Sequence, residues 1–156
     1  MAITAFGFMA LGGALLIFLE FGKATNASAT DQQFYSNDDG ATWFADEAGK
    51  FTPFVKDGKS AYVAHVYTCD GGKTKFVLYL ERYSSVAIKQ IAADRAKGAK
   101  HDAFFYRQAL RDAIEVKPPK APESEWISQD AAKASKIIEP RCPDGRKTNV
   151  EAVLPP

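Results

Sequence analysis

Apolar and polar positions divide the chain into an apolar N-terminal run and a mixed remainder. Residues 2–19 carry no charged side chain. As a helix with a rise of about 1.5 Å per residue, this run reaches about 27 Å, close to the hydrocarbon thickness of a bilayer. It predicts a transmembrane anchor over residues 1–22, followed by a small, polar tether over residues 23–33.

A cleaved secretory signal peptide is the alternative interpretation of the same run. Ala27, Ser28 and Ala29 have the small side chains that a cleavage site needs. No Lys or Arg precedes the run, however, and Glu20 and Lys23 fall where a signal peptide is neutral. These features favour a retained anchor.

Small residues form a stripe along the predicted anchor. Gly7, Ala10 and Ala14 share one helical face, and small side chains at this spacing let two membrane helices approach closely. The stripe predicts a packing face toward another membrane subunit, although Gly and Ala are common in membrane helices generally. Lys23 is the only basic residue between the anchor and Lys50, and this scarcity favours an extracytoplasmic C-terminal domain.

Beyond the tether, alternation with a period of two predicts β-strands. A polar turn lies between aromatic pairs in residues 34–44, and β-rich runs at 61–69 and 75–83 flank the sequence Asp-Gly-Gly-Lys. Both segments predict β-hairpins, joined by a loop over residues 51–58, in a sheet of about four antiparallel strands. Three residues of the last strand are expected on its buried face: Phe76, Leu78 and Leu80.

The period then changes to that of an α-helix. A helix is expected over residues 84–97 with Gly98 as its end, a second from Asp102 with Phe105, Ala109 and Ala113 aligned, and a third over 128–138. Residues 149–154 form one more candidate strand. The predicted fold is α+β: a transmembrane helix followed, over residues 34–156, by a small antiparallel sheet with two or three helices on one face.

One turn carries a specific motif. Ser36, Asp38, Gly40, Thr42 and Trp43 match the pattern S-x-D-x-G-x-T-W, so the segment resembles an Asp-box. The resemblance implies a hairpin in which the Asp carboxylate accepts backbone N–H groups, the Gly has a positive φ and the Trp packs under the loop. Asp-boxes recur once per blade in sialidase-like propellers, whereas this chain offers one copy and is too short for blades. The motif therefore predicts a structural turn and gives no ground for a sialidase activity.

The order of elements loosely resembles that of small, uncharacterised, single-pass membrane-anchored bacterial proteins. The features on which this resemblance rests are the anchor, the two hairpins, the helix after Tyr-Leu-Glu-Arg-Tyr and the C-terminal Cys-Pro-Asp-Gly. This resemblance implies the architecture and no activity.

The two cysteines bear on the compartment. Cys69 ends a predicted strand and Cys142 lies in a turn near the C-terminus, too far apart in sequence for a CxxC redox motif. In an exported domain they are expected to form a disulfide, which would close a loop of about 70 residues and contribute about 4 kcal/mol. Two separate buried thiols are the alternative.

Composition and charge exclude several classes of protein. The 156 residues include 20 basic and 19 acidic side chains, a formal charge of +1 that leaves no basic footprint for nucleic acid. Hydrophobic residues make up 46% and charged residues 25%, which excludes wholesale disorder. With two cysteines and two histidines, the chain has few candidate ligands for a metal, haem or iron–sulfur site, so no cofactor is expected.

No motif points to catalysis. His65 and His101 have no Cys, Asp or Glu at ligand spacing, so structural roles are expected for both. Asp38 and Asp39 form a carboxylate pair of the kind used in acid–base chemistry, but the Asp-box accounts for Asp38 and leaves Asp39 exposed. Phosphate-binding loop, nucleophile elbow and HExxH motifs are missing from the sequence.

Three functions stay open. The favoured one is a non-catalytic accessory or structural subunit of a larger membrane complex, such as a respiratory or photosynthetic one, anchored in the inner or cell membrane. The second is a periplasmic or cell-surface module that binds carbohydrate or peptide through exposed aromatic residues such as Trp43, Tyr62 or Trp126. The third is a small hydrolase. Residues 104–106 (Phe-Phe-Tyr) are expected in the core, with an interface patch as the alternative.

Overall fold

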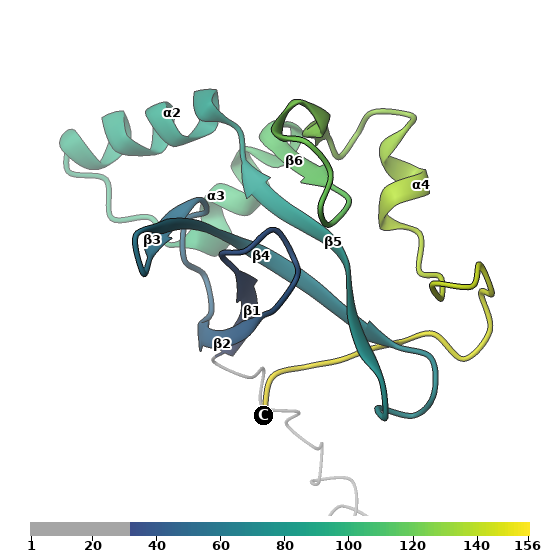
Figure 1. Cartoon of the computed structure of the whole chain (residues 1–156). Helices are drawn as coiled ribbons and strands as arrows, with labels where there is room; N and C mark the ends of the chain where they lie inside the picture. The colour runs from purple at the N-terminus through teal and green to yellow at the C-terminus, as the bar shows by residue number, and fades with distance from the viewer. Residues whose placement is uncertain (1–31) are drawn as a thin grey trace, which may run out of the picture.

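The computed structural model describes residues 32–156, which form an antiparallel sheet with three helices (Figure 1). The main path of the eight-stranded sheet has the order β2-β1-β4-β5-β6-β7, and both β3 and β8 pair with β4. The α+β class and the antiparallel sheet are confirmed. The predicted anchor and its stripe of Gly7, Ala10 and Ala14 lie outside the described residues. Among residues 32–156, no helix has the length and apolar character needed to cross a membrane.

The first hairpin pairs β1 (Gln32–Ser36) with β2 (Phe44–Glu47). Since β1 begins at Gln32, the tether predicted over residues 23–33 ends two residues too late. The loop predicted over residues 51–58 was also wrong in part, because β3 (Phe54–Lys56) pairs with the start of β4 (Lys59–Thr68).

The connection between β3 and β4 explains that error. Asp57 and Gly58 both have positive φ, at 52° and 74°. This is the geometry that Asp-Gly favours in a two-residue hairpin turn. The strand before it has only three residues, too few for an alternating pattern to be recognised in the sequence.

Strand β5 (Lys75–Tyr83) pairs with β4 along most of its length, but a bulge at Leu78 shifts the register between His65 and Val66 of β4. As a result, Val77 and Leu80 are buried, whereas Phe76 and Leu78 are only partly buried. The prediction that Phe76, Leu78 and Leu80 share the buried face was therefore wrong. An extra residue in one strand reverses the alternation beyond it, and no local pattern announces this.

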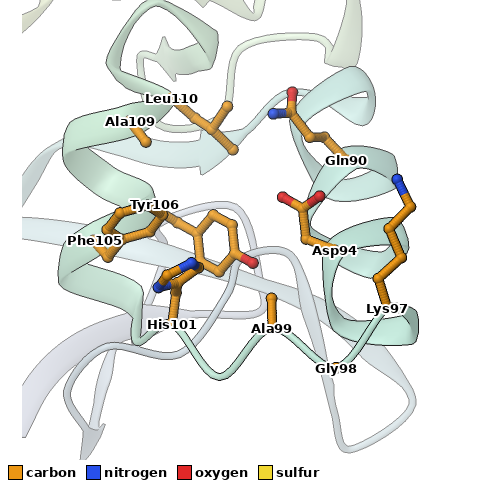
Figure 2. A pocket seen from close by; sticks show the side chains of 10 residues that line it. All are labelled: Gln90, Asp94, Lys97, Gly98, Ala99, His101, Phe105, Tyr106, Ala109 and Leu110. Atoms are coloured by element: carbon orange, nitrogen blue, oxygen red, sulfur yellow. The ribbon is translucent and has the colours of Figure 1, made fainter.

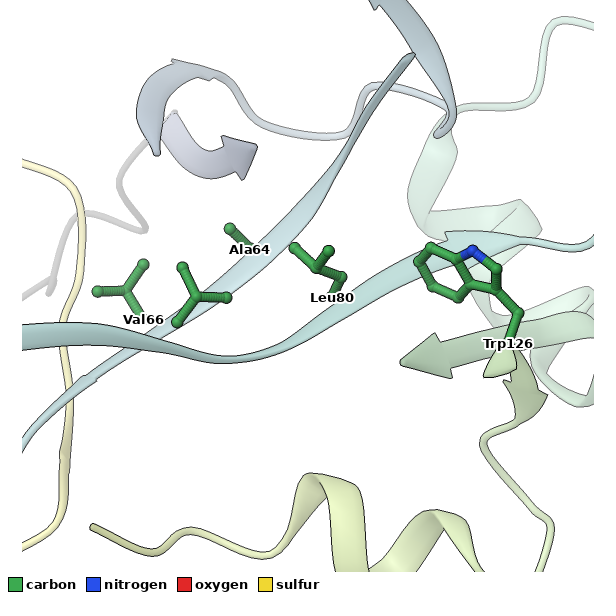
Figure 3. Close-up of a cluster of buried hydrophobic side chains, with 5 residues drawn as sticks. Ala64, Val66, Leu80 and Trp126 are labelled. Carbon is green, nitrogen blue, oxygen red and sulfur yellow. The ribbon is translucent and has the colours of Figure 1, made fainter. Parts of the chain in front are cut away.

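Two hydrophobic clusters stabilise the domain. The first is formed by residues of β4 and β5 together with Trp126, and its buried members are Ala64, Val66, Val77, Leu80 and Trp126 (Figure 3). The second joins β5 and β6 (Ile114–Lys117) to α2 (Ser85–Ala96) and α3 (Ala103–Ala109). The buried members of this second cluster are Tyr83, Ala87, Ile91, Tyr106 and Ile114.

Helix α2 begins and ends close to its predicted positions, whereas α3 begins as predicted but ends at Ala109, before the Ala113 that the prediction included. The Ser84 side chain accepts a hydrogen bond from the Ala87 N–H at the start of α2, and Gly98, with φ of 89°, follows its end. The Asp102 carboxylate accepts from the Phe105 N–H (2.8 Å) at the start of α3. These caps satisfy backbone N–H groups that have no partner inside a helix.

The C-terminal third contains more strands than expected. The helix predicted over residues 128–138 is shorter: β7 (Ile127–Ser128) pairs with β6, and α4 (Ala134–Ile138) contacts β5 and β6. A 3-10 turn, η1 (Arg111–Ala113), follows α3, and another, η2 (Glu123–Glu125), precedes β7. The predicted C-terminal strand is β8 (Glu151–Ala152), which pairs with β4.

Candidate functional site

The Asp-box-like turn between β1 and β2 has the geometry that its motif implies. Asp38 Oδ1 accepts from the Thr42 N–H (2.9 Å), and Oδ2 accepts from the Thr42 hydroxyl (2.5 Å). The Ser36 hydroxyl donates to Asp38 Oδ1 (2.9 Å) and accepts from the Gly40 N–H (2.8 Å). Gly40 has φ of +82°, and Trp43 packs against the first hydrophobic cluster. The Asp38 carboxylate is thus used by the turn itself.

The turn between β4 and β5 repeats this arrangement, so the expectation of one copy was wrong. Asp70 Oδ1 accepts from the Thr74 N–H (2.8 Å), and the Thr68 hydroxyl donates to the same oxygen (2.9 Å). The Thr68 hydroxyl also accepts from the Gly72 N–H (2.9 Å). Thr68 stands where the motif has Ser, and Lys75 where it has Trp. These two replacements hid the second copy in the sequence, although the spacing of Asp, Gly and Thr is the same.

Asp39, expected to be exposed, has a partner from a distant part of the chain. Its Oδ1 lies 2.5 Å from Nζ of Lys117, whose side chain is only 3% exposed. The same ammonium donates to the Ala121 carbonyl (2.8 Å). Asp38 and Asp39 therefore have separate structural partners, which argues against a shared acid–base role.

A buried carboxylate fixes α3 to the sheet. Glu81 of β5 is 5% exposed, and its Oε2 lies 3.1 Å from Nε2 of His65 on β4. Arg107 of α3 donates from Nη1 to Oε1 and from Nη2 to Oε2 (3.1 Å). Burial by itself raises the pKa of Glu81, but the bonds from His65 and Arg107 lower this pKa to about 2. Glu81 is therefore charged at neutral pH, and His65 has the structural role that was expected.

Sequence reasoning missed Glu81 and Arg107. A glutamate inside an otherwise apolar strand run was the available signal for Glu81. Its partners come from another strand and from α3, 26 residues away in the case of Arg107. Such a pairing cannot be inferred from spacing along one element.

Of the aromatic residues named for ligand binding, Trp126 is buried in the core, and Trp43 and Tyr62 are partly buried against it. Trp126 is 8% exposed and lies between Tyr62 (ring centroids 5.0 Å apart) and the guanidinium of Arg82 (4.3 Å from the ring). Trp43 and Tyr62 pack against the same cluster. A binding surface built on an exposed Trp126 was therefore a wrong expectation.

The exposed aromatic residues lie on α3 instead. Phe104 is 69% and Phe105 45% exposed, whereas Tyr106 is 1% exposed. The core prediction for residues 104–106 thus holds for Tyr106 alone. Phe105, Ala109 and Ala113 were predicted to align along this helix, but Ala113 lies beyond its end, in η1, and the buried residue of α3 is Tyr106.

A cleft of about 580 Å³ separates α2 from α3 (Figure 2). One wall is α2, and the other is α3 with the loop before it. The aromatic rings of His101 and Phe105 stack at the rim, with centroids 3.8 Å apart. The cleft is lined by Gln90, Asp94, Lys97, Gly98, Ala99, His101, Phe105, Tyr106, Ala109 and Leu110.

Polar groups in this cleft lack partners in the described part of the chain. The hydroxyl of Tyr106 is buried and makes no hydrogen bond there. In Figure 2 this hydroxyl points away from α3, toward the α2 wall that carries Gln90 and Asp94. A mixed polar and apolar concave surface of this kind suits a small ligand or an inserted side chain. Neither His101 nor Tyr106 was expected at a site, because the cleft exists only once the two helices are packed.

The comparisons with known proteins do not place the chain in a family. No protein family, no curated protein and no solved structure matches it. Within residues 32–156 there is also no group of three His, Cys, Asp or Glu side chains arranged to hold a metal ion.

Proposed function

We propose that this protein is a non-catalytic, single-pass membrane protein that acts as an accessory subunit of a larger membrane complex. Its residues 34–156 lie on the periplasmic or extracellular side and contact a neighbouring subunit through α3. The observation that supports the proposal is the exposure of two adjacent phenylalanines, Phe104 (69%) and Phe105 (45%). Neighbouring large apolar side chains in water are a feature of surfaces that another protein covers.

Helix α3 is held rigidly enough to present these rings. Asp102 caps its start, Tyr106 anchors its inner face in the second cluster, and Arg107 joins it to Glu81. A preorganised helix loses little conformational entropy when it binds, so more of the energy of apolar contact remains for association. The fixed position of α3 therefore favours a protein contact at Phe104 and Phe105 over an incidental exposure of these two rings.

The disulfide supports the compartment in the proposal. Cys69 and Cys142 are bonded, as the sequence analysis expected for an exported domain. Disulfides persist in oxidising compartments and are rare in the cytosol. Together with the apolar run over residues 2–19, this favours an anchored domain outside the cytoplasm.

Co-purification from membranes tests the proposal. The tagged full chain is extracted in mild detergent. It is expected to co-purify with a large complex, whose mass and subunits native mass spectrometry identifies. Phe104→Ser should lose the partners while thermal unfolding stays unchanged. Leu154→Ser is the matched control, because Leu154 is also strongly exposed (73%) but lies near the C-terminus.

A second pair of substitutions tests the anchor. Gly7→Leu with Ala10→Leu keeps the segment apolar, so insertion should persist while close packing against another helix is lost. A wild-type chain that runs alone, or is found soluble without residues 1–29, would overturn the subunit proposal. The periplasmic or cell-surface binding module is then the better reading, and the α2–α3 cleft is the observation that favours it.

A further inference from the structure

The polar groups of the α2–α3 cleft are available to a ligand. Gln90, Asp94 and Lys97 follow one another at intervals of four and three residues, so they lie along one side of α2. None of these three side chains makes a hydrogen bond or an ion pair within residues 32–156. On the surface of a helix this would be ordinary, but here all three line a concave site.

The Tyr106 hydroxyl at the cleft is the strongest sign of a missing partner. The residue is 1% exposed, and its hydroxyl is the buried polar atom of the cleft without a hydrogen bond in the described structure. An unsatisfied buried hydroxyl destabilises a fold, and a phenylalanine would fill the same space without that cost. A ligand group that bonds to this hydroxyl gives a physical reason for a tyrosine here.

The remaining lining is apolar and partly flat. The stacked rings of His101 and Phe105 form one side, and Ala99, Ala109 and Leu110 add aliphatic surface. Such a surface packs well against the C–H groups on one face of a saturated ring.

Charge distinguishes between ligand classes. Asp94 and Lys97 bring one negative and one positive charge to the same wall of the cleft. For a ligand with a net charge, attraction by one of these groups is offset by repulsion from the other, whereas a neutral polyhydroxylated ligand bonds to both. An amide, a carboxylate, an ammonium and a phenol together supply the donors and acceptors that several neighbouring hydroxyls require.

We propose that this cleft binds a neutral pyranose sugar. One face of the sugar ring packs on His101 and Phe105, its hydroxyls donate to Asp94 and bond to Gln90, and one hydroxyl reaches the hydroxyl of Tyr106. Phe105 belongs both to this cleft and to the surface of the subunit proposal, whereas Phe104, whose substitution tests that proposal, does not line the cleft. Substitutions at Phe104 and at Tyr106 therefore distinguish failure of one proposal from failure of the other.

Binding of simple glycosides to the full chain tests this inference. The protein is purified in a zwitterionic detergent, because glycoside detergents would compete for the site. The probes are the methyl glycosides of glucose, galactose, mannose and N-acetylglucosamine, with glucuronate and glucosamine as charged counterparts. Saturation-transfer NMR and titration are expected to show binding of at least one neutral glycoside, about fivefold or more tighter than either charged counterpart.

Two substitutions and their controls locate the site. Tyr106→Phe and Asp94→Asn should each weaken binding about tenfold, which is the effect of losing a good hydrogen bond to a ligand. Tyr67→Phe and Asp112→Asn make the same chemical changes outside the cleft and should leave affinity unchanged. Neither the Tyr106 hydroxyl nor the Asp94 carboxylate makes a hydrogen bond in the described structure, so both variants are expected to stay folded. Thermal unfolding checks this.

Three outcomes would overturn the inference. They are the absence of binding by every neutral glycoside, tighter binding of glucosamine or glucuronate, and equal binding by the cleft variants and their controls. Co-purification of the Tyr106→Phe variant with its membrane partners is measured in parallel, since loss of sugar binding with retained partners separates this site from the subunit contact.

Discussion

Two turns of this protein share one local design and differ in what holds them in place. The first turn covers residues 36–42 and the second covers residues 68–74, each with a Ser or Thr hydroxyl and an Asp carboxylate bonding the same backbone positions. Their backbones also agree: Asp39 and Gly40 have φ of 61° and 82°, and Gly71 and Gly72 have φ of 69° and 91°.

The first turn is held by non-covalent contacts with the last residue of β6 and the segment that follows it. Asp39 pairs with Lys117, and the Lys120 N–H donates to the Asp39 carbonyl (3.0 Å). Gly40 lies so close to this segment that a Cβ on it would come within 2.8 Å of Pro119 Cβ. The first turn is therefore packed into the domain.

The second turn is open to solvent and is held by a covalent bond. A Cβ on Gly71 or Gly72 would meet no atom within 4 Å. Cys69, inside this turn, forms the disulfide with Cys142. A few residues close in sequence therefore suffice to shape a turn, whereas its attachment to the domain depends on distant residues that differ from one copy to the next.

Loss of the disulfide is expected to have the largest effect and to separate the two turns. Cys69→Ser with Cys142→Ser opens a loop of sequence separation 73, which lowers the free energy of unfolding by about 4 kcal/mol in the loop-entropy treatment. Denaturant titration measures this change. Amide hydrogen exchange should accelerate at Thr74 of the second turn and stay slow at Thr42 of the first; equal acceleration would contradict the comparison.

Substituting alanine for Gly40 or for Gly72 should lower the free energy of unfolding by unequal amounts. Gly40→Ala combines a positive φ with a clash against Pro119 and is expected to cost about 3 kcal/mol. Gly72→Ala has the positive φ but open space and is expected to cost about 1 kcal/mol. Thermal or denaturant unfolding of both variants measures the difference, and similar losses would show that packing against Pro119 does not matter.

Alanine at the two aspartates should give similar effects. Asp38→Ala and Asp70→Ala each leave the Ser or Thr hydroxyl and the Thr backbone N–H of one turn without the carboxylate. Because both turns are solvent-accessible at this point, water replaces part of the lost bonding, and a fall of a few degrees in melting temperature is expected for each. Asn at either position retains one acceptor oxygen, so the fall in melting temperature should be smaller than with alanine.

The smallest expected effect is the lowering of the pKa values of the two aspartates, Asp38 and Asp70. For Asp38, burial raises the pKa but bonds from Thr42 and Ser36 bring it below the ordinary value of 3.8; for Asp70, bonds from Thr74 and Thr68 do the same. The folded-state pKa of each is lowered, so each contributes stability above pH 3.8 and loses it as the pH falls through the folded-state value. Carboxyl-carbon NMR should give both midpoints below 3.8, and removal of the disulfide should raise the midpoint of Asp70 alone.

The local chemistry of the turns and helix ends could be predicted from the sequence. The bonds of Ser36, Asp38 and Gly40, and the caps Ser84 and Asp102, each join residues within four positions of one another. Interactions over so short a distance form in any chain that adopts the turn, whatever packs against it. The same reasoning would have found the second turn if Thr68 had been accepted in place of Ser and Lys75 in place of Trp.

The buried network, the exposed phenylalanines and the cleft were decided by tertiary structure. The bulge at Leu78 decided that Val77, and not Phe76 or Leu78, shares the buried face of β5 with Leu80. The packing of α3 on the sheet buried Tyr106 rather than Phe105. Glu81 is charged in the interior because His65 and Arg107, from other elements, bond to it there. Local sequence sets which bonds neighbours along the chain can make, but burial and pairing depend on which surfaces meet, and that is settled only when the whole chain packs at once.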